Sequence, residues 1–326
     1  MTTGVVLMTY GSPRDRADVA AYLTRVRGGR APSEETVREF ERRYDLIGGS
    51  PLIPITRAQA LGLERALGDG FVCGAGMRFS EPSVAKAVGE LVERGAGRIL
   101  GLIISPQYSP LIMGGYNRAL EEAAAPHGVP ARVVEGWWDE PAFVGVMADR
   151  VRRGLARFPA GVRGRVPVLL TAHSLPKRVV DQEPGFVAQL EASAGLIAAA
   201  AGLARGRWRF AYQSAGHTPE EWLKPDILDV LPELARAGHR HVLLAPVQFL
   251  GDHLETLYDI DVGGQEQADA AGFVQFERVP APNADPDLCA ALAAVVRRNP
   301  AAGGVPRPGA TTGRAPSPSP RPEGTL

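Results

Sequence analysis

VVLMTYGSP (residues 5–13) and VLLTAHSLP (residues 168–176) repeat one pattern at two distant places in this chain of 326 residues. Each copy has an apolar run, a polar or aromatic pair, a small residue and a proline. A continuous apolar run is typical of a strand that is covered on both faces, and the proline prevents the chain from continuing as a central strand. The pattern therefore predicts two copies of one strand-centred unit.

A second pair of segments supports the duplication. GAGRILGLIISP (95–106) and AGHRHVLLAP (237–246) each join glycine and a basic residue to an apolar run that ends in proline. Helix-like stretches, such as residues 35–44 and 83–94, alternate with these runs. This alternation predicts an α/β protein with two Rossmann-like parallel sheets flanked by helices. A ligand cleft is expected between the units, at the carboxyl ends of the strands.

The length suits two domains of about 150 residues each. We expect an N-terminal domain at residues 1–145 and a C-terminal domain at residues 146–298. We expect that the last helix, residues 286–298, can pack across the domain boundary. The rest of the chain, residues 299–326, is rich in Pro, Gly and Ser and is predicted to be disordered.

Composition excludes several classes of protein. Lys plus Arg and Asp plus Glu are equal at 36 each, which argues against a nucleic-acid partner. The two cysteines, Cys73 and Cys289, form no CxxC motif, so a four-thiolate iron–sulfur cluster within one chain is excluded. The N-terminus lacks the pattern of a signal peptide, and no apolar stretch reaches the ~18 residues of a membrane span. These features predict a cytoplasmic protein without a transmembrane segment.

His173 and Tyr10 occupy matching places in the two repeats. Both follow a predicted central strand, where side chains face the ligand crevice of an α/β sheet. A histidine there is suited to proton transfer near neutral pH, and a phenol opposite it could frame a flat, metal-carrying ligand. The alternative interpretations are a buried, hydrogen-bonded histidine and a tyrosine that anchors a turn.

The segment GDHLETLYDID (251–261) offers a second candidate site. Glu255 and Asp259 lie four residues apart, so a helix would place both carboxylates on one face beside His253. Such a ridge could bind a cation or accept protons. The alternative is structural: Asp252 as the N-cap of a helix that begins at His253, with Glu255 at the third position, is a capping box.

Other residues have mixed interpretations. Arg25, Arg27, Arg30 and Arg43 could form a solvated helix face, or some could bind ligand carboxylates in a bidentate manner. The pair Trp137–Trp138 is interpreted as a packing element. No GxGxxG motif follows the first strand, which disfavours a Rossmann nucleotide enzyme.

Residues 3–298 resemble the ferrochelatase family. The motifs that carry the resemblance are MTYGSP (8–13), YDLIGGSPLIPIT (44–56), ISPQYSPL (104–111), GYN (115–117), GWWDEP (136–141), TAHSLP (171–176), YQSAGHTPEEWLKPD (212–226) and PVQFLGDHLETLYDID (246–261). The resemblance implies two Rossmann-like domains with a porphyrin cleft between them.

The resemblance also implies roles for individual residues. His173 and Glu255 would be catalytic and would bind the metal, and Asp259 would continue the acidic row. Position 263 is Gly where many members have a third acid, so the acidic row is shorter here, and the resemblance does not define the outer metal route. Porphyrin-binding positions would be Tyr10, Arg27, Arg30, Arg43, Ser50 and Tyr116.

The implied activity is insertion of Fe(II) into a porphyrin in haem biosynthesis, with loss of two pyrrole protons. With a tyrosine at position 10, the sequence resembles the coproporphyrin III enzymes of Gram-positive bacteria. Coprohaem is therefore the expected product. The alternatives are a protoporphyrin IX ferrochelatase and a non-catalytic porphyrin or haem carrier. A cobalt or nickel chelatase for a sirohydrochlorin-type ring is disfavoured, because those proteins usually present paired histidines.

The expected partners are small molecules. Porphyrin and ferrous iron are substrates, and no tightly bound cofactor and no [2Fe–2S] cluster are expected. A monomer is expected, with transient contacts to enzymes of the haem pathway.

Overall fold

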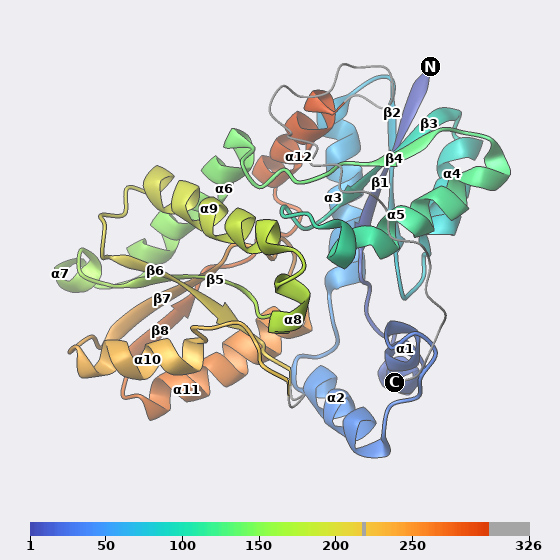
Figure 1. Ribbon diagram of the computed structural model, residues 1–326. Helices are drawn as coiled ribbons and strands as arrows, with labels where there is room; N and C mark the ends of the chain where they lie inside the picture. Colours follow the sequence, from blue (N-terminus) through green and yellow to red (C-terminus); the bar gives the residue numbers. More distant parts are fainter. Residues whose placement is uncertain (217–219, 300–326) are drawn as a thin grey trace.

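The computed structural model describes residues 1–216 and 220–299. Its strands form two four-stranded parallel sheets, one in each half of the chain (Figure 1). The strands are β1 (Thr2–Thr9), β2 (Phe71–Met77), β3 (Ala96–Ile103), β4 (Ala131–Val133), β5 (Val168–His173), β6 (Trp208–Gln213), β7 (His241–Pro246) and β8 (Gln275–Arg278).

The two sheets have the same topology. Their strand orders are β2-β1-β3-β4 and β6-β5-β7-β8, so each sheet places its first strand in the interior, next to its third. The two repeated motifs supply β1 and β5, and the second pair of motifs supplies β3 and β7. The duplication and the α/β class predicted from the sequence are therefore confirmed.

The helices link the strands as crossover connections. The longer ones are α1 (Val19–Val26), α2 (Glu34–Leu46), α3 (Leu52–Leu67), α4 (Val84–Glu93), α5 (Pro110–Ala124), α6 (Pro141–Ala156), α9 (Pro184–Ala200), α10 (Ile227–Arg236) and α12 (Pro286–Arg298). The shorter ones are α7 (Ala160–Arg163), α8 (Lys177–Val180) and α11 (Gln265–Ala270), with 3-10 turns at Arg16–Asp18 and Ala125–His127. A π-helix, η3, spans Glu255–Gly264.

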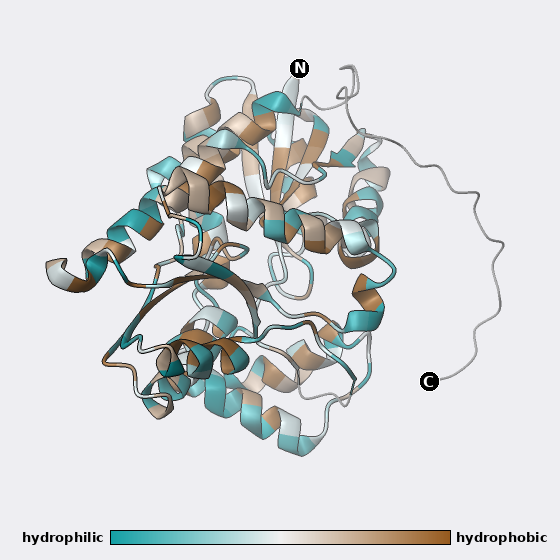
Figure 2. Cartoon of the chain, turned by 60° about the vertical axis from the view of Figure 1, so that its left-hand side comes forward, coloured by the Kyte–Doolittle hydropathy of each residue, from teal (hydrophilic) through white to brown (hydrophobic). Residues whose placement is uncertain are grey.

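One core joins the two halves. Val5 of β1 and Val168 of β5 belong to the same cluster of buried residues, together with side chains from α3, α6, α9 and α12. Helix α12 packs against α3 and α6, and α6 packs against α9. Separate clusters lie beneath α4 and α5 and beneath α10 and α11, on the other faces of the sheets. Figure 2 shows hydrophobic residues on the strands and hydrophilic residues on the outer turns of the helices.

The predicted boundaries involve two helices, α6 and α12. The helix expected at residues 286–298 is α12, and it packs on α3 of the N-terminal half. The domain limits at residues 1–145 and 146–298 stay a prediction, and position 145 lies within α6. Of the predicted disordered tail, residues 300–326 lie outside the described residues.

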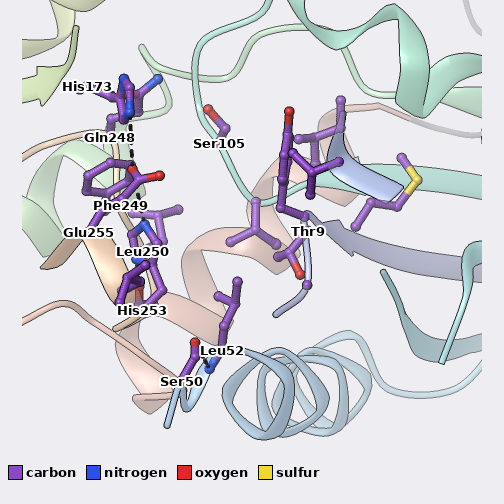
Figure 3. A pocket seen from close by; sticks show the side chains of 18 of the residues that line it. Thr9, Ser50, Leu52, Ser105, His173, Gln248, Phe249, Leu250, His253 and Glu255 are labelled. Carbon is purple, nitrogen blue, oxygen red and sulfur yellow. Dashed lines mark hydrogen bonds and ion pairs between the residues drawn. The ribbon is translucent and has the colours of Figure 1, made fainter. Parts of the chain in front are cut away.

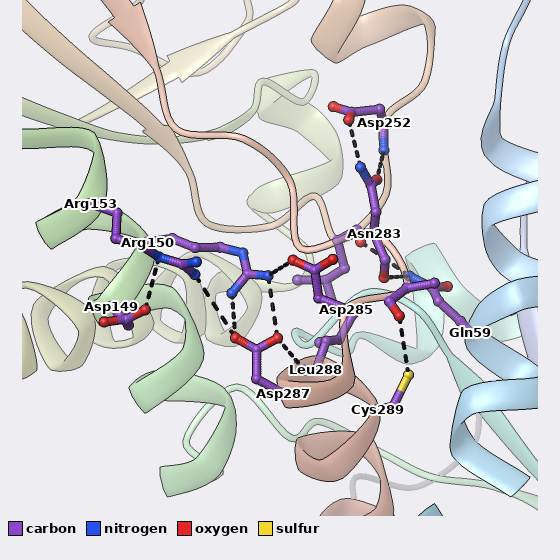
Figure 4. Close-up of polar contacts among 12 residues, drawn as sticks. Gln59, Asp149, Arg150, Arg153, Asp252, Asn283, Asp285, Asp287, Leu288 and Cys289 are labelled. Carbon is purple, nitrogen blue, oxygen red and sulfur yellow. Dashed lines mark hydrogen bonds and ion pairs between the residues drawn. The ribbon is translucent and has the colours of Figure 1, made fainter. Parts of the chain in front are cut away.

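A polar network fixes the chain where it crosses from β8 to α12 (Figure 4). The buried Gln59 of α3 donates from Nε2 to the carbonyls of Leu250 (3.1 Å) and Asn283 (2.8 Å). The Asn283 side chain exchanges two hydrogen bonds with Asp252, each 2.8 Å long. Further along, Arg150 of α6 is almost fully buried and binds two aspartates that precede and begin α12, Asp285 and Asp287. The network holds the segment before η3 against both halves.

None of the helices among the described residues is long and apolar enough to span a membrane.

Gly62 lies where α3 packs against α12. A Cβ at this position would lie 2.4 Å from Sγ of Cys289, so Gly62→Ala forces an overlap that costs about 1–3 kcal/mol. The better helix propensity of alanine returns about 0.5–1 kcal/mol. We expect a net loss of about 1 kcal/mol in the free energy of urea unfolding.

Two controls isolate that overlap. In a Cys289→Ala background the Sγ atom is gone, so Gly62→Ala should no longer destabilise the protein. Gly145→Ala, in the exposed interior of α6 with nothing within 4 Å of its Cβ, should be neutral or stabilising. An equal loss from Gly62→Ala in the wild type and in the Cys289→Ala background would show that the overlap with Sγ of Cys289 is not the cause.

Candidate active site

A cavity of about 470 Å³ lies at the carboxyl ends of β1 and β5. Its walls come from both halves of the chain and from α1 and α2, which close over it. Most of the wall is apolar, and His173, Gln248, Glu255 and His253 gather on one side of it (Figure 3). The lining includes Thr9, Tyr10, Tyr22, Phe40, Tyr44, Ser50, Ser105, Tyr116, His173, Gln248, His253 and Glu255. A volume of this size suits a small organic ligand.

His173 is the last residue of β5, and its side chain is about a quarter exposed. Its backbone N–H donates to Oε1 of Gln248 (3.0 Å). Its Nδ1 lies against the carbonyl oxygen of Ser174. A carbonyl only accepts, so Nδ1 carries a hydrogen, and in the neutral form of the ring the lone pair is on Nε2. That lone pair faces the cavity side on which Glu255 lies, where it can take a proton or bind a metal.

Glu255 lies between two histidines. Its Oε2 is 3.7 Å from Nε2 of His173 and 3.5 Å from Nε2 of His253. Burial raises the pKa of the Glu255 carboxyl, but the charge of His173 and the hydrogen bond and charge of His253 outweigh it and hold the pKa at about 2. Glu255 is therefore ionised near neutral pH.

His253 is held by its backbone surroundings. Nδ1 donates to the carbonyl of Gly251 (3.0 Å), so Nε2 is directed toward Glu255. Burial lowers the pKa of His253, but the hydrogen bond to Glu255 and its charge outweigh burial and leave the pKa above its usual value. Together the two histidines and the carboxylate form a chain of proton-carrying groups along the wall.

The predicted capping box is wrong. The helix is a π-helix that starts at Glu255, not an α-helix capped by Asp252. Instead, the Asp252 carboxylate accepts hydrogen bonds from Asn283 (2.8 Å) and Arg278 (3.0 Å). Glu255 therefore takes part in no capping box, and its carboxylate lies near His173 and His253. Single π-helical turns are frequently found at functional sites.

Asp259 lies along η3 beyond Glu255. Its Oδ1 is 3.7 Å from Nη1 of Arg43 in α2, and both side chains are mostly buried. Burial raises the pKa of Asp259, and the negative charge of Glu255 raises it further. The acidic pair predicted from the sequence thus faces one region, although an arginine neutralises its second member.

Tyr10 and Tyr116 lie close together and form an aromatic wall of the cavity. Their ring centroids are 6.4 Å apart, and the ring of Phe79 is 4.8 Å from that of Tyr10. The guanidinium of Arg78 lies 4.7–6.0 Å from the centroids of all three rings. Burial raises the pKa of the Tyr10 phenol, and the charge of Arg78 opposes this effect. Gly115 makes room for Arg78, because a Cβ there would lie 1.9 Å from its Nη2.

Of the remaining predicted residues, one lines the cavity and three lie outside its lining. Ser50 lines the cavity. Arg43 lies at the junction of α2 and η3, outside the cavity lining. Arg27 and Arg30 are exposed in the loop after α1 and do not line the cavity.

Three residues at this site have roles that the sequence analysis did not assign. His253 lies two residues before Glu255 in the sequence, and this spacing is the signal that points to its role. Arg78 and Gln248 carry no signal of their own, since an isolated Arg or Gln after an apolar run is common. Their roles depend on contacts with Tyr10 and His173, which are 68 and 75 residues away in the sequence.

Comparison with known proteins decides the family. The ferrochelatase family model matches residues 2–300. The chain is 38% identical to the ferrochelatase of Herpetosiphon aurantiacus over 301 residues, which cover 90% of this chain and 98% of that one.

The chain belongs to the ferrochelatase family.

Other ferrochelatases are similar over the same length. The coproporphyrin III ferrochelatase of Bacillus subtilis is 36% identical over 301 residues, covering 90% of this chain and 96% of that one. The solved structure of SirB from Bacillus subtilis with Fe3+ shares the fold, with a TM-score of 0.58 and 13% identity over 91% of this chain and 95% of that one. That likeness confirms the chelatase fold.

As a ferrochelatase, the protein is a metal chelatase that inserts ferrous iron into a porphyrin in haem biosynthesis. The site meets the needs of this reaction. The cavity is mostly apolar, and an imidazole in its wall adjoins a carboxylate that is ionised near neutral pH. An imidazole can act as a base, and imidazole and carboxylate are ligand types that suit Fe(II) without the softness of thiolates.

Gly115→Ala should displace Arg78 from the aromatic wall without unfolding the protein. The colliding atoms are the far end of a flexible side chain, which can swing away. Tyr10 and Tyr116 would then lose the cation between them, and the ring would be held less well. We expect kcat/KM for iron insertion to fall about tenfold, with an unchanged thermal unfolding midpoint.

The adjacent Gly114 provides the control, because a Cβ at Gly114 has nothing within 4 Å. Gly114→Ala should retain activity. In an Arg78→Ala background, Gly115→Ala should add no further loss, since both changes remove the same contact. Additive losses would place the effect of Gly115 elsewhere.

Proposed function

We propose that this ferrochelatase converts coproporphyrin III to coprohaem, with His173 as the base and Glu255 as its acidic partner. The observation that supports these roles most directly is the distance of 3.7 Å between Nε2 of His173 and Oε2 of Glu255 on the cavity wall. Both groups lie at the end of a central strand or the start of η3, where the sheet and the buried network hold them in place.

The reaction exchanges two protons for one divalent cation. The free-base ring loses two N–H protons, Fe2+ takes their place between four nitrogens, and the ring remains neutral at its centre. Nε2 of His173 accepts a pyrrole proton, and the imidazolium so formed is stabilised by the ionised Glu255. Glu255 and His253 carry protons away from the ring. Asp259 receives the metal ion, which moves in the opposite direction, toward the ring. Asp259 ends the row, because position 263 is Gly.

The proposed substrate has four carboxylates. Among similar proteins, those of Anoxybacillus flavithermus and Bacillus subtilis are coproporphyrin III ferrochelatases. Tyr10 and Tyr116 would line the face and edge of the ring, and Ser50 would bind at its border. Arg27, Arg30 and Arg43 would hold carboxylates, for which the planar guanidinium is suited. Arg27 and Arg30 would approach from the loop after α1.

The remaining assignments extend the same proposal. Fe(II) is a substrate, and we propose that the enzyme uses no tightly bound cofactor and no [2Fe–2S] cluster, since the chain has two cysteines and both are buried. We further propose a monomer in the cytoplasm that binds no nucleic acid and meets other haem-pathway enzymes transiently. The neutral net charge supports the absence of nucleic acid among its ligands.

His173→Ala tests the proposed base. The variant should bind coproporphyrin III with nearly unchanged affinity, measured by quenching of porphyrin fluorescence. Its kcat for anaerobic Fe(II) insertion should fall about a thousandfold, the usual scale for loss of a general base. Ser105→Ala, a change of another polar group in the cavity wall, is the matched control and should keep most activity. Normal insertion by His173→Ala would contradict the assignment.

Substrate preference is tested by turnover of two porphyrins. We expect kcat/KM for coproporphyrin III to exceed that for protoporphyrin IX by about tenfold or more, because each additional carboxylate paired with arginine contributes at least 1.4 kcal/mol. Arg43→Gln should narrow this ratio. An equal or reversed ratio in the wild type would retain the activity and overturn the substrate. Binding of the ring without turnover would identify a carrier.

A further inference from the structure

Arg43 and Asp259 form an ion pair across the junction between α2 and η3. Nη1 of Arg43 is 3.7 Å from Oδ1 of Asp259, and the two side chains are 17% and 20% exposed. Nε of Arg43 donates to Glu39 on its own helix at 2.8 Å. The ring of Tyr258 lies 4.9 Å from the guanidinium carbon. The arginine is thus held in one position, with one edge on its own helix and another on Asp259.

While Arg43 and Asp259 are paired with each other, neither can fully take the role that the proposed function gives it. The proposed function gives Arg43 to a carboxylate of the ring and Asp259 to the incoming metal ion. Here each neutralises the other in a place that is mostly shielded from water, where charge interactions are strong. A carboxylate already paired with a guanidinium attracts a divalent cation less, so Asp259 binds metal well only when Arg43 has another partner.

A guanidinium can change partners without losing all of its bonds. It has five N–H donors in a fixed fork, and the Nε edge remains on Glu39 while the edge facing Asp259 is exchanged. The contact between α2 and η3 does not depend on the exchanged pair alone. Arg42 also donates to the hydroxyl of Tyr258, and Tyr44 and Leu254 pack in the same apolar cluster.

We infer that Arg43 couples binding of the ring to binding of the metal: a ring carboxylate takes Arg43 from Asp259, and the released Asp259 then accepts the divalent cation. This inference rests on the proposed function, because it requires a ring that carries carboxylates. It goes beyond that function by predicting cooperative binding. By linkage, the ring tightens metal binding and the metal tightens ring binding by the same factor. Metal would thus be drawn to the acidic row when a ring is ready to receive it.

Cobalt binding to the full chain tests the coupling. The ring used is zinc coproporphyrin III, whose centre is already filled, so no insertion competes with binding. The dissociation constant of Co2+ is measured by calorimetry with and without this ring, at concentrations where ring absorbance shows saturation. In the wild type, the ring should tighten Co2+ binding about tenfold, within the usual range of coupling between two sites.

Three variants assign the effect. In Arg43→Gln, Co2+ should bind without the ring as tightly as it binds the wild type with the ring, and the ring should add less than about twofold. In Asp259→Asn, which is isosteric, the ring-dependent part of Co2+ affinity should disappear. Arg42→Gln is the matched control, because Arg42 neighbours Arg43 on α2 and contacts Tyr258; it should keep the wild-type coupling.

The outcomes separate this inference from the proposed function. Equal Co2+ affinity with and without the ring, in a wild type that turns over coproporphyrin III, would overturn the coupling alone. Full coupling retained in Arg43→Gln or Asp259→Asn would also overturn it. Failure of the wild type to turn over coproporphyrin III would overturn the proposed substrate and, with it, this inference.

Discussion

The carboxyl ends of β1 and β5 open into the same cavity, and the site depends on that arrangement. Each strand lies inside its sheet with a parallel neighbour on both sides, so its hydrogen bonds leave little freedom in the position of its last residues. The helices between the sheets share one apolar core, which fixes one sheet relative to the other. Tyr10 and His173 therefore line one cavity from two rigid supports.

The apolar cavity determines how its few charged groups behave. Where water is scarce, Glu255 interacts strongly with both histidines, and its pKa falls to about 2 although burial alone would raise it. The same surroundings favour an ion pair between Asp259 and Arg43 over two separately solvated charges. The row of groups along η3 is thus a set of coupled charges, and a change in the partner of one alters the others.

The support for this row lies behind it, in the segment that joins the halves. Asp252 is held by Asn283 and Arg278, and Gln59 of α3 ties Leu250 and Asn283 to the N-terminal half. These bonds precede the first residue of η3, so the position of Glu255 is set by contacts with β8, with the loop before α12 and with α3. Residues from α3, β8 and the loop before α12, which are far apart in the sequence, thereby fix the position of the Glu255 carboxylate.

The sequence by itself determined the class of fold, because apolar runs of strand length that alternate with helix-like segments depend only on local composition. It also located Tyr10 and His173 at strand ends, and its motifs identified the family. It did not predict η3, nor that Asp252 would bind Asn283 and Arg278 instead of capping a helix. The pairing of Arg43 with Asp259 and the placement of Arg78 beside Gly115 were likewise decided by tertiary structure. Such contacts join elements that are far apart in the chain, and no local pattern of residues specifies which side chains will meet when those elements pack.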